Sequence, residues 1–205
     1  SHIRNRLRPR LREATIVTVS FGDRRSIEDA ATRLFEKIDR AIAAGELDAS
    51  AEFDVVASSM GGLVARYAAT PREGERTLRA ARIFTICTPH VGASMAETFT
   101  WTRLMRQLKA GSEFLEALND AETARPYELI PYARLGDAMV GEENTAPPGE
   151  APWWTPGAPF LSGHFTAFDD PRINADILRR IRGEAPFTTE PRAPLPGDEA
   201  EERGD

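Results

Sequence analysis

One stretch of the chain limits its possible folds more than any other, because a short apolar run passes directly into a glycine-containing helical segment. Residues 53–58 (FDVVAS) predict a strand, and after Ser-Met-Gly-Gly the letters LVARYAA continue with helical character. A serine at the apex of such a strand-to-helix turn has a strained backbone, and the residues two before and two after it must be small. Ala57 and Gly61 meet this requirement if Ser59 is the apex residue.

Ser59 is a better apex residue than Ser58, which would place the bulky Met60 in a crowded position. The helix that follows then begins at Ser59, where its first amides and its dipole favour negative charge. The Met60 amide would be one donor to a tetrahedral oxyanion. In the alternative interpretation the two serines only end a strand, and the two glycines allow close packing. The strand and the helix on either side are readable independently, which favours Ser59 as a nucleophile.

Further strands and helices are predicted on both sides of this turn. After Ser26, apolar residues recur at helical spacing, which indicates a helix with one buried face. The last helix is predicted to begin after Asp170, with Pro171 at its first position, where proline is favoured. Strands that alternate with helices indicate an α/β domain with a mostly parallel sheet, whose reactive groups gather at the carboxyl ends of the strands. We expect strands over residues 15–20, 53–58, 82–88 and 127–135, helices over residues 27–42, 94–120 and 171–181, and a loop over residues 141–163.

The stretch DVVASSMGGLVARYAA resembles the nucleophile turn of lipase- and esterase-like α/β-hydrolases, especially the branch with GPI inositol-deacylase-like and bacterial lipase proteins. Two residues differ from the common pattern, since Ala57 stands where glycine is commoner and Ser58 where histidine is common. Residues 88–92 (TPHVG) match the family's TPHxG segment, and residues 108–120 are similar to a helical segment of this branch. The matches run in order over residues 15–182. The resemblance implies an α/β-hydrolase fold, with helices on both faces of the sheet.

A nucleophilic serine needs a base within hydrogen-bond reach. The chain has three histidines, of which His2 lies in an arginine-rich terminus. The resemblance implies that the segment around His90 is structural and lines the site. His164, in the segment LSGHFTAF before the last predicted helix, stands where the base of this family falls. In the alternative interpretation His164 is an ordinary loop histidine, solvated or bonded within the core.

The candidate acid is Asp137, which follows the predicted 127–135 strand, where this fold expects a carboxylate. The family often has a D-x-x-V pattern here, and Asp137 to Val140 fit it. Glu142 and Glu143 remain alternatives, because they are close to Asp137 in the sequence.

Serine, aspartate and histidine follow one another along the chain in the order of the α/β-hydrolases. Ser59 would attack an acyl carbonyl while His164 takes its proton, and Asp137 would hold the imidazole and stabilise its charged form. Water activated by His164 would then release the acyl group. We expect this chemistry to need no metal and no organic cofactor.

Substrate contacts are assigned to apolar side chains between the last two predicted strands and to neighbours of the nucleophile. We expect residues 93–125 to form a helical cap or insert whose Trp101 and Met105 contribute to an acyl-binding wall, because ligand pockets are mostly apolar. Ordinary packing of two helices is the alternative for most of these side chains. Ser58 and His90 are also assigned to substrate binding.

The domain boundaries are predicted from composition and from the expected strand order. No strand and loop of the kind that supplies the second oxyanion donor precedes residue 15, so we expect an α/β-hydrolase domain over residues 1–183 that is truncated at its N-terminus and lacks its first strands. Residues 184–205 are acidic and rich in proline, and we expect them to form a disordered tail.

Composition excludes several classes of function. A net charge of −6 and a pI near 5.3 argue against binding to nucleic acid, and no apolar run approaches the ~18 residues of a membrane-spanning helix. The single cysteine excludes an internal disulfide and a structural zinc site built from thiolates.

The cytoplasm is the default location of the protein, and secretion stays open because the true N-terminus is not visible. The oligomeric state is also left open.

The expected function is therefore that of a serine carboxylic ester hydrolase of the lipase or esterase type, with a small-molecule ester or lipid as substrate. An acyltransferase, a thioesterase and an amidase are alternatives, because all of them share the acyl-enzyme step. A non-catalytic, hydrolase-like binding scaffold is the alternative from a different class.

Overall fold

A computed structural model describes residues 5, 7–11, 14–22, 25–98, 101–121, 125–157, 162–187 and 194–196. Their centre is a four-stranded parallel sheet in which each strand pairs with the next one along the chain. The strands are β1 (Phe53–Ser58), β2 (Ala80–Ile86), β3 (Glu128–Arg134) and β4 (Trp153–Thr155). Ser58, Ile86, Tyr132 and Trp153 stand in one row across the sheet, so the carboxyl ends of β1 and β2 are level.

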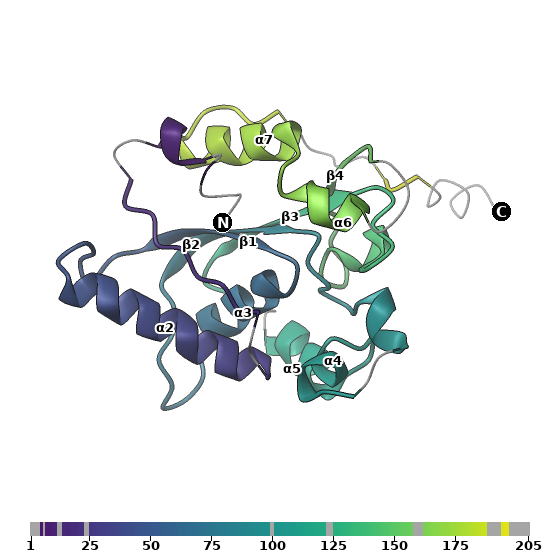
Figure 1. The fold of residues 1–205 in the computed structure, drawn as a ribbon, viewed down its shortest axis with the longest axis horizontal. Coiled ribbons are helices and arrows are strands. Elements are labelled where there is room, and N and C mark those ends of the chain that lie inside the picture. Colours follow the sequence, from purple (N-terminus) through teal and green to yellow (C-terminus); the bar gives the residue numbers. More distant parts are fainter. Residues whose placement is uncertain are drawn as a thin grey trace.

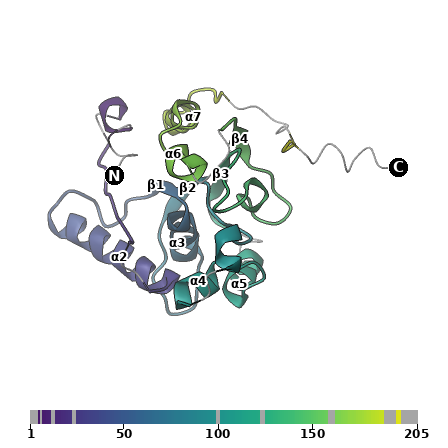
Figure 2. The same ribbon diagram turned by 45° about the vertical axis from the view of Figure 1, so that its right-hand side comes forward.

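Helices cover both faces of the sheet (Figure 1). One face carries α2, α3, α4 and α5, and the other carries α6 and α7, as the turned view in Figure 2 also shows. The α-helices are α2 (Ile27–Ala43), α3 (Met60–Ala69), α4 (Arg103–Gln107), α5 (Glu113–Ala121), α6 (Ser162–Ala167) and α7 (Pro171–Ile181). The short 3-10 helices are η1 (Arg8–Arg10), η2 (Ser94–Glu97) and η4 (Glu142–Asn144).

Two apolar clusters lie on opposite faces of the sheet. Ile83 belongs to the cluster under α2 and α3, whereas its neighbour Phe84 belongs to the cluster under α7. Successive side chains of a strand point to opposite faces, so a strand that is apolar at both positions must be covered on both sides. This arrangement confirms the α/β fold with a parallel sheet and helices on both faces.

The two best-defined helices begin where the sequence indicates. The Ser26 side chain accepts a hydrogen bond from the Asp29 amide at 3.2 Å and caps α2. The Asp170 side chain caps α7 in the same way, with Pro171 at the first helical position. No helix among the described residues is long and apolar enough to span a bilayer.

Two predictions about strands are wrong. Residues 15–20 form no strand, because β-branched residues form a strand only where the backbone pairs with another strand. Among the described residues β1 pairs only with β2, so residues 15–20 are not paired with its other edge. Trp153–Thr155, which fall within the predicted 141–163 loop, form β4 beside β3. Three residues are too few for a periodic signal, so only their tertiary pairing makes them a strand.

The terminal predictions are only partly covered by the structure. At the N-terminus the structure describes η1, which lies near the end of α7 (Figure 1), where Arg182 Nη2 donates to the Arg10 carbonyl oxygen at 2.5 Å. Most of the predicted tail, residues 184–205, lies outside the described residues. The described part begins with residues 184–187, and the amide of Phe187 donates a hydrogen bond to Asp176 Oδ1 on α7 at 2.6 Å.

Candidate functional site

Ser59 occupies the turn between β1 and α3 with a left-handed backbone, φ 50° and ψ −136°. Its amide donates to the Ile86 carbonyl oxygen at 2.9 Å, and the Thr88 hydroxyl donates to the Ser59 carbonyl oxygen at 2.8 Å. These two bonds tie the turn to the end of β2, which stabilises a conformation that is otherwise unfavourable for a residue with a side chain. The predicted sharp turn is present.

Glycine is required in this turn at Gly62 more than at Gly61. A Cβ atom at Gly61 would meet Phe21 and Ala57 at 3.8 and 3.9 Å, which is ordinary van der Waals contact. A Cβ atom at Gly62 would lie 2.7 Å from Thr88 Cγ2 and closer still to Thr88 Oγ1. The expected crowding therefore falls one residue later than the pattern predicts, where α3 packs against the segment that follows β2.

His164 lies on α6 and faces both of the other candidate residues. Its Nε2 atom is 3.0 Å from Ser59 Oγ, and its Nδ1 atom is 2.8 Å from Asp137 Oδ2. The preceding glycine allows this approach, because a Cβ atom at Gly163 would lie 2.9 Å from the Gly136 carbonyl oxygen. The structure thus brings together the three residues that were singled out separately in the sequence.

Asp137 follows β3 and is almost completely buried, with 1% of its surface exposed. Its Oδ1 atom accepts hydrogen bonds from the amides of Met139 at 3.0 Å and Val140 at 3.2 Å. Burial acts to raise the pKa of the Asp137 carboxyl, but the bond and charge of His164, the Val140 amide and the Cys87 thiol outweigh it. The pKa therefore lies below its usual value, and Asp137 is a carboxylate at neutral pH.

The alternative acids are engaged elsewhere. Glu142 Oε2 accepts a hydrogen bond from the Gly136 amide at 3.1 Å, and Glu143 Oε1 accepts one from Asn144 Nδ2 at 3.3 Å. Both side chains therefore bond to the loop that follows β3, while Asp137 reaches the imidazole.

Cys87 is a member of the site that sequence reasoning did not assign. Its thiol, one Asp137 carboxylate oxygen and one His164 ring nitrogen all lie within 4.8 Å of one another. Sulfur, oxygen and nitrogen donors could hold zinc, but a metal needs the thiolate. Burial and the charge of Asp137 raise the pKa of the Cys87 thiol well above its usual value. Because His164 Nδ1 already bonds Asp137 Oδ2, the three groups form a hydrogen-bonded cluster in this structure. The available signal was the position of Cys87 near the carboxyl end of the predicted 82–88 strand, where reactive groups gather.

The residues assigned to substrate binding are placed differently from one another. Ser58 ends β1 and is half-buried, and Met105 is half-buried on α4 against the cluster under α2 and α3. Trp101 is 87% exposed just before α4. His90 has no exposed surface, and both of its ring nitrogens have protein partners. The expectation that His90 contacts substrate is therefore wrong for this structure, because the side chain turns inward to bond Arg66 and Thr85.

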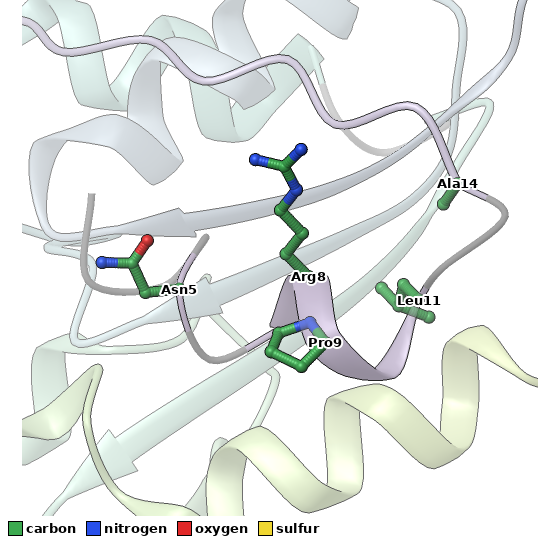
Figure 3. A pocket seen from close by; sticks show the side chains of 5 residues that line it. All are labelled: Asn5, Arg8, Pro9, Leu11 and Ala14. Carbon is green, nitrogen blue, oxygen red and sulfur yellow. The ribbon is translucent and has the colours of Figure 1, made fainter.

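A shallow hollow lies away from these residues, on the N-terminal segment (Figure 3). Its lining residues are Asn5, Arg8, Pro9, Leu11 and Ala14, in and around η1. None of these side chains is a nucleophile or a general base, so the described lining offers no groups for the cleavage of an acyl bond.

Comparison with protein families places much of the chain in a described family. A family model described as "Domain of unknown function (DUF7379)" matches residues 25–133. This span includes Ser59 and ends just before the loop that carries Asp137. No curated protein matches the chain.

Solved structures resemble the chain in fold at low sequence identity. The mature form of the lipase BlEst2 from Bacillus licheniformis is 16% identical with a TM-score of 0.50, and the likeness covers 70% of this chain and 69% of that one. The product of the gene lin2722 from Listeria innocua is 16% identical with a TM-score of 0.51, covering 80% and 69%.

A third likeness, to phospholipase PlaB from Legionella pneumophila in complex with thio-NAD, has 16% identity and a TM-score of 0.49. It covers 65% of this chain, which spans only 34% of the length of that protein. The first two likenesses agree with the α/β-hydrolase fold that the sequence resemblance implies.

Proposed function

The chain belongs to the family described as a domain of unknown function (DUF7379), and we propose that it is a serine hydrolase of lipase or esterase type. In this proposal it cleaves carboxylic esters through an acyl-enzyme on Ser59. One observation carries the proposal: His164 lies 3.0 Å from the Ser59 hydroxyl and 2.8 Å from the Asp137 carboxylate, across three separate segments of the chain.

The order of proton transfers follows from the hydrogen bonds. Because Asp137 is ionised and only accepts, His164 Nδ1 carries the proton of their shared bond. With that proton on Nδ1, the Nε2 atom is positioned to accept from the Ser59 hydroxyl. As Ser59 Oγ bonds to the acyl carbon, Nε2 takes its proton, and the imidazolium that forms is stabilised by the carboxylate. The same proton then passes to the leaving alcohol. Nε2 next deprotonates a water that attacks the acyl carbon, and this second proton passes to Ser59 Oγ as the acid leaves.

The start of α3 is suited to the negative charge that develops on the carbonyl oxygen. Met60 is the first helical residue after Ser59, and amides in a first helical turn have no acceptor within the helix. The dipole of α3, a helix of 10 residues, adds partial positive charge at the same end. We assign the Met60 amide as an oxyanion donor, a contact of a kind that contributes about 100- to 1,000-fold to rate.

The substrate assignments that are compatible with the structure remain part of the proposal. Residues 93–125 are proposed as a helical insert beside the site, within a hydrolase domain assigned to residues 1–183. Trp101 projects an exposed indole from this insert, which suits contact with an apolar acyl chain. Ser58 and Met105 are the other proposed contacts. The finer resemblance, to the GPI inositol-deacylase branch, stays a prediction.

The test is covalent labelling with a fluorophosphonate, which reacts with an activated serine. We expect the folded chain to be labelled on the peptide that contains Ser59, and Ser59→Ala to lose the label. Ser58→Ala is the matched control, because it removes the adjacent hydroxyl and leaves the label on Ser59. Label that persists in Ser59→Ala, or a folded wild type that takes no label, would contradict the proposal.

Turnover of p-nitrophenyl esters tests the other two residues. His164→Ala and Asp137→Asn should each lower kcat by at least about 1,000-fold, because a triad acts as a unit. Product analysis with added alcohol, thiol or amine acceptors then distinguishes hydrolysis from acyl transfer.

A further inference from the structure

His90, which follows β2, lies at the centre of a buried hydrogen-bond network that the proposed chemistry does not use. Its Nδ1 atom is 2.6 Å from Arg66 Nη1, and its Nε2 atom is 2.9 Å from Thr85 Oγ1. The Arg66 side chain is also fully buried, and its Nη2 atom donates to Asn119 Oδ1 on α5 at 2.8 Å. Asn119 Nδ2 donates in turn to the His90 carbonyl oxygen at 3.1 Å. The four side chains come from α3, β2, α5 and the segment after β2.

The same network reaches the loop that carries the acid. The His90 amide donates to the Asn144 carbonyl oxygen at 2.9 Å, and Asn144 Nδ2 donates to the Val140 carbonyl oxygen at 2.7 Å. The Val140 amide then donates to Asp137 Oδ1 at 3.2 Å. Arg66 belongs to α3, the helix that begins directly after Ser59. A continuous set of bonds therefore joins the helix of the nucleophile to the carboxylate of the acid.

The protonation state of His90 follows from its partners. A guanidinium is always charged and has only donors, so Nδ1 must accept from Arg66. The proton of the neutral ring is then on Nε2, which donates to Thr85 Oγ1. Burial, together with the charges of Arg66 and Arg125, lowers the pKa of His90 well below its usual value, so the ring keeps this form.

We infer that His90 is a positioning residue, which sets the distance between the helix of Ser59 and the loop of Asp137. Its ring accepts a hydrogen bond from Arg66 on that helix, and its amide donates one to the Asn144 carbonyl oxygen in that loop. The inference rests on the proposed function. His90 touches no reacting atom, and its effect on the reaction passes through the separation of the two segments. A shift of about 1 Å between reacting groups is enough to cost about 100-fold in rate.

Two amide variants separate the two ring nitrogens. His90→Asn keeps an acceptor near the position of Nδ1 for Arg66, whereas His90→Gln extends to the position of Nε2 and loses that acceptor. We expect His90→Gln and Arg66→Met to slow the reaction of Ser59 with a fluorophosphonate by about 10- to 100-fold, measured well below each variant's Tm. His90→Asn should stay close to the wild type.

Tyr132→Phe is the control for stability alone. It removes a buried hydrogen bond to Asp176 at 2.7 Å, within the cluster on the opposite face of the sheet. It should lower Tm and leave the labelling rate unchanged. If the labelling rates of all variants, Tyr132→Phe included, follow only their Tm values, His90 has a merely structural role and the inference is overturned.

Two readouts remain valid if Ser59 proves unreactive and the proposed function fails. Amide hydrogen exchange at Met139 and Val140 should accelerate in His90→Gln and not in Tyr132→Phe, and unchanged exchange would overturn the inference. Nitrogen NMR of the wild-type chain should show His90 as a neutral ring protonated on Nε2. A proton on Nδ1 would also overturn the inference, without any need for a variant that folds.

Discussion

Among the non-glycine residues that the structure describes, Ser59 and Cys87 have left-handed backbones, with φ values of 50° and 47°. They follow the paired residues Ser58 and Ile86, so they stand next to each other at the carboxyl end of the sheet. Each such conformation costs about 1–3 kcal/mol and persists only where its surroundings enforce it. Strain is thus concentrated where the serine, the imidazole and the carboxylate meet.

Cys87 should be unreactive in the native chain despite its place beside the triad. It is 1% exposed, and the raised pKa keeps it as a thiol, whereas alkylating agents and disulfide reagents react with the thiolate. We expect no measurable reaction with a disulfide reagent under native conditions and one equivalent per chain in guanidinium, since the chain has one cysteine. Rapid stoichiometric reaction of the folded chain would show that the thiol is accessible and that this description is wrong.

The elements of the fold position the site through the close contact of α3 with the segment that follows β2. Gly62 lies against Thr88, whose hydroxyl in turn holds the Ser59 carbonyl oxygen. On the other side of the site, Gly163 lies against the Gly136 carbonyl oxygen and so brings α6 up to the turn after β3. Each contact places one catalytic candidate, and each depends on a residue without a side chain.

A pair of alanine substitutions tests the contact of α3. Gly62→Ala should lower the free energy of unfolding by about 2 kcal/mol, because the new methyl group overlaps Thr88 and either the side chain or the helix must move. Gly61→Ala should cost less than about 1 kcal/mol, because its methyl group finds ordinary contacts. Urea unfolding measures both values. Equal losses in the two variants would show that α3 and Thr88 are not in close contact.

The strands and helices that the sequence predicts correctly are those with long or distinctive local signals. The run 53–58, the capped helices and the apolar 127–135 region all have patterns that extend over several residues. The sequence predicts no helix around His164, but the residue lies on α6, a helix of only six residues. So short a helix is stabilised by its contacts with the sheet rather than by its own propensity, and local patterns therefore miss it.

The interior of the folded chain holds several titratable groups, and their shifted pKa values make the free energy of unfolding depend on pH. His90 is neutral in the folded state, with a pKa well below the usual 6.5, while an unfolded chain protonates it near that value. The unfolded state therefore binds more protons as pH falls through about 6.5, and stability decreases. Asp137, whose pKa is lowered, adds a further loss when pH falls below its usual 3.8.

The free energy of unfolding should thus decrease by about 1 kcal/mol between pH 7 and 5.5 because of His90. His90→Asn, which cannot titrate there, should show a weaker dependence over the same interval, and both chains share every other ionisable group. Chemical unfolding at the two pH values provides the measurement. An identical decrease in the two chains would mean that His90 is protonated in the folded state or does not contribute.

The candidate site could be predicted to a considerable degree, because each member has a local signal of its own. Ser59 stands in a strand-to-helix pattern, Asp137 follows a strand, and His164 precedes a capped helix. The role of His90 could not be predicted in this way. An inward or an outward imidazole is compatible with the same letters, and the choice depends on Arg66, which lies on another element and is itself held by Asn119.

The alternation of β1, β2 and β3 with helices, and the three residue types capable of acyl chemistry, follow from the letters of the chain, because backbone propensity and side-chain spacing act over a few neighbours. The contacts between segments that are distant in the sequence are determined only by the tertiary structure. Ser59 and His164 are 105 residues apart in sequence, yet Ser59 Oγ and His164 Nε2 are 3.0 Å apart. Residues 15–20 have strand composition but pair with no strand in the part of the chain that the structure describes. Burial, pairing and hydrogen-bond partners belong to the packed molecule, since each depends on atoms that no local pattern contains.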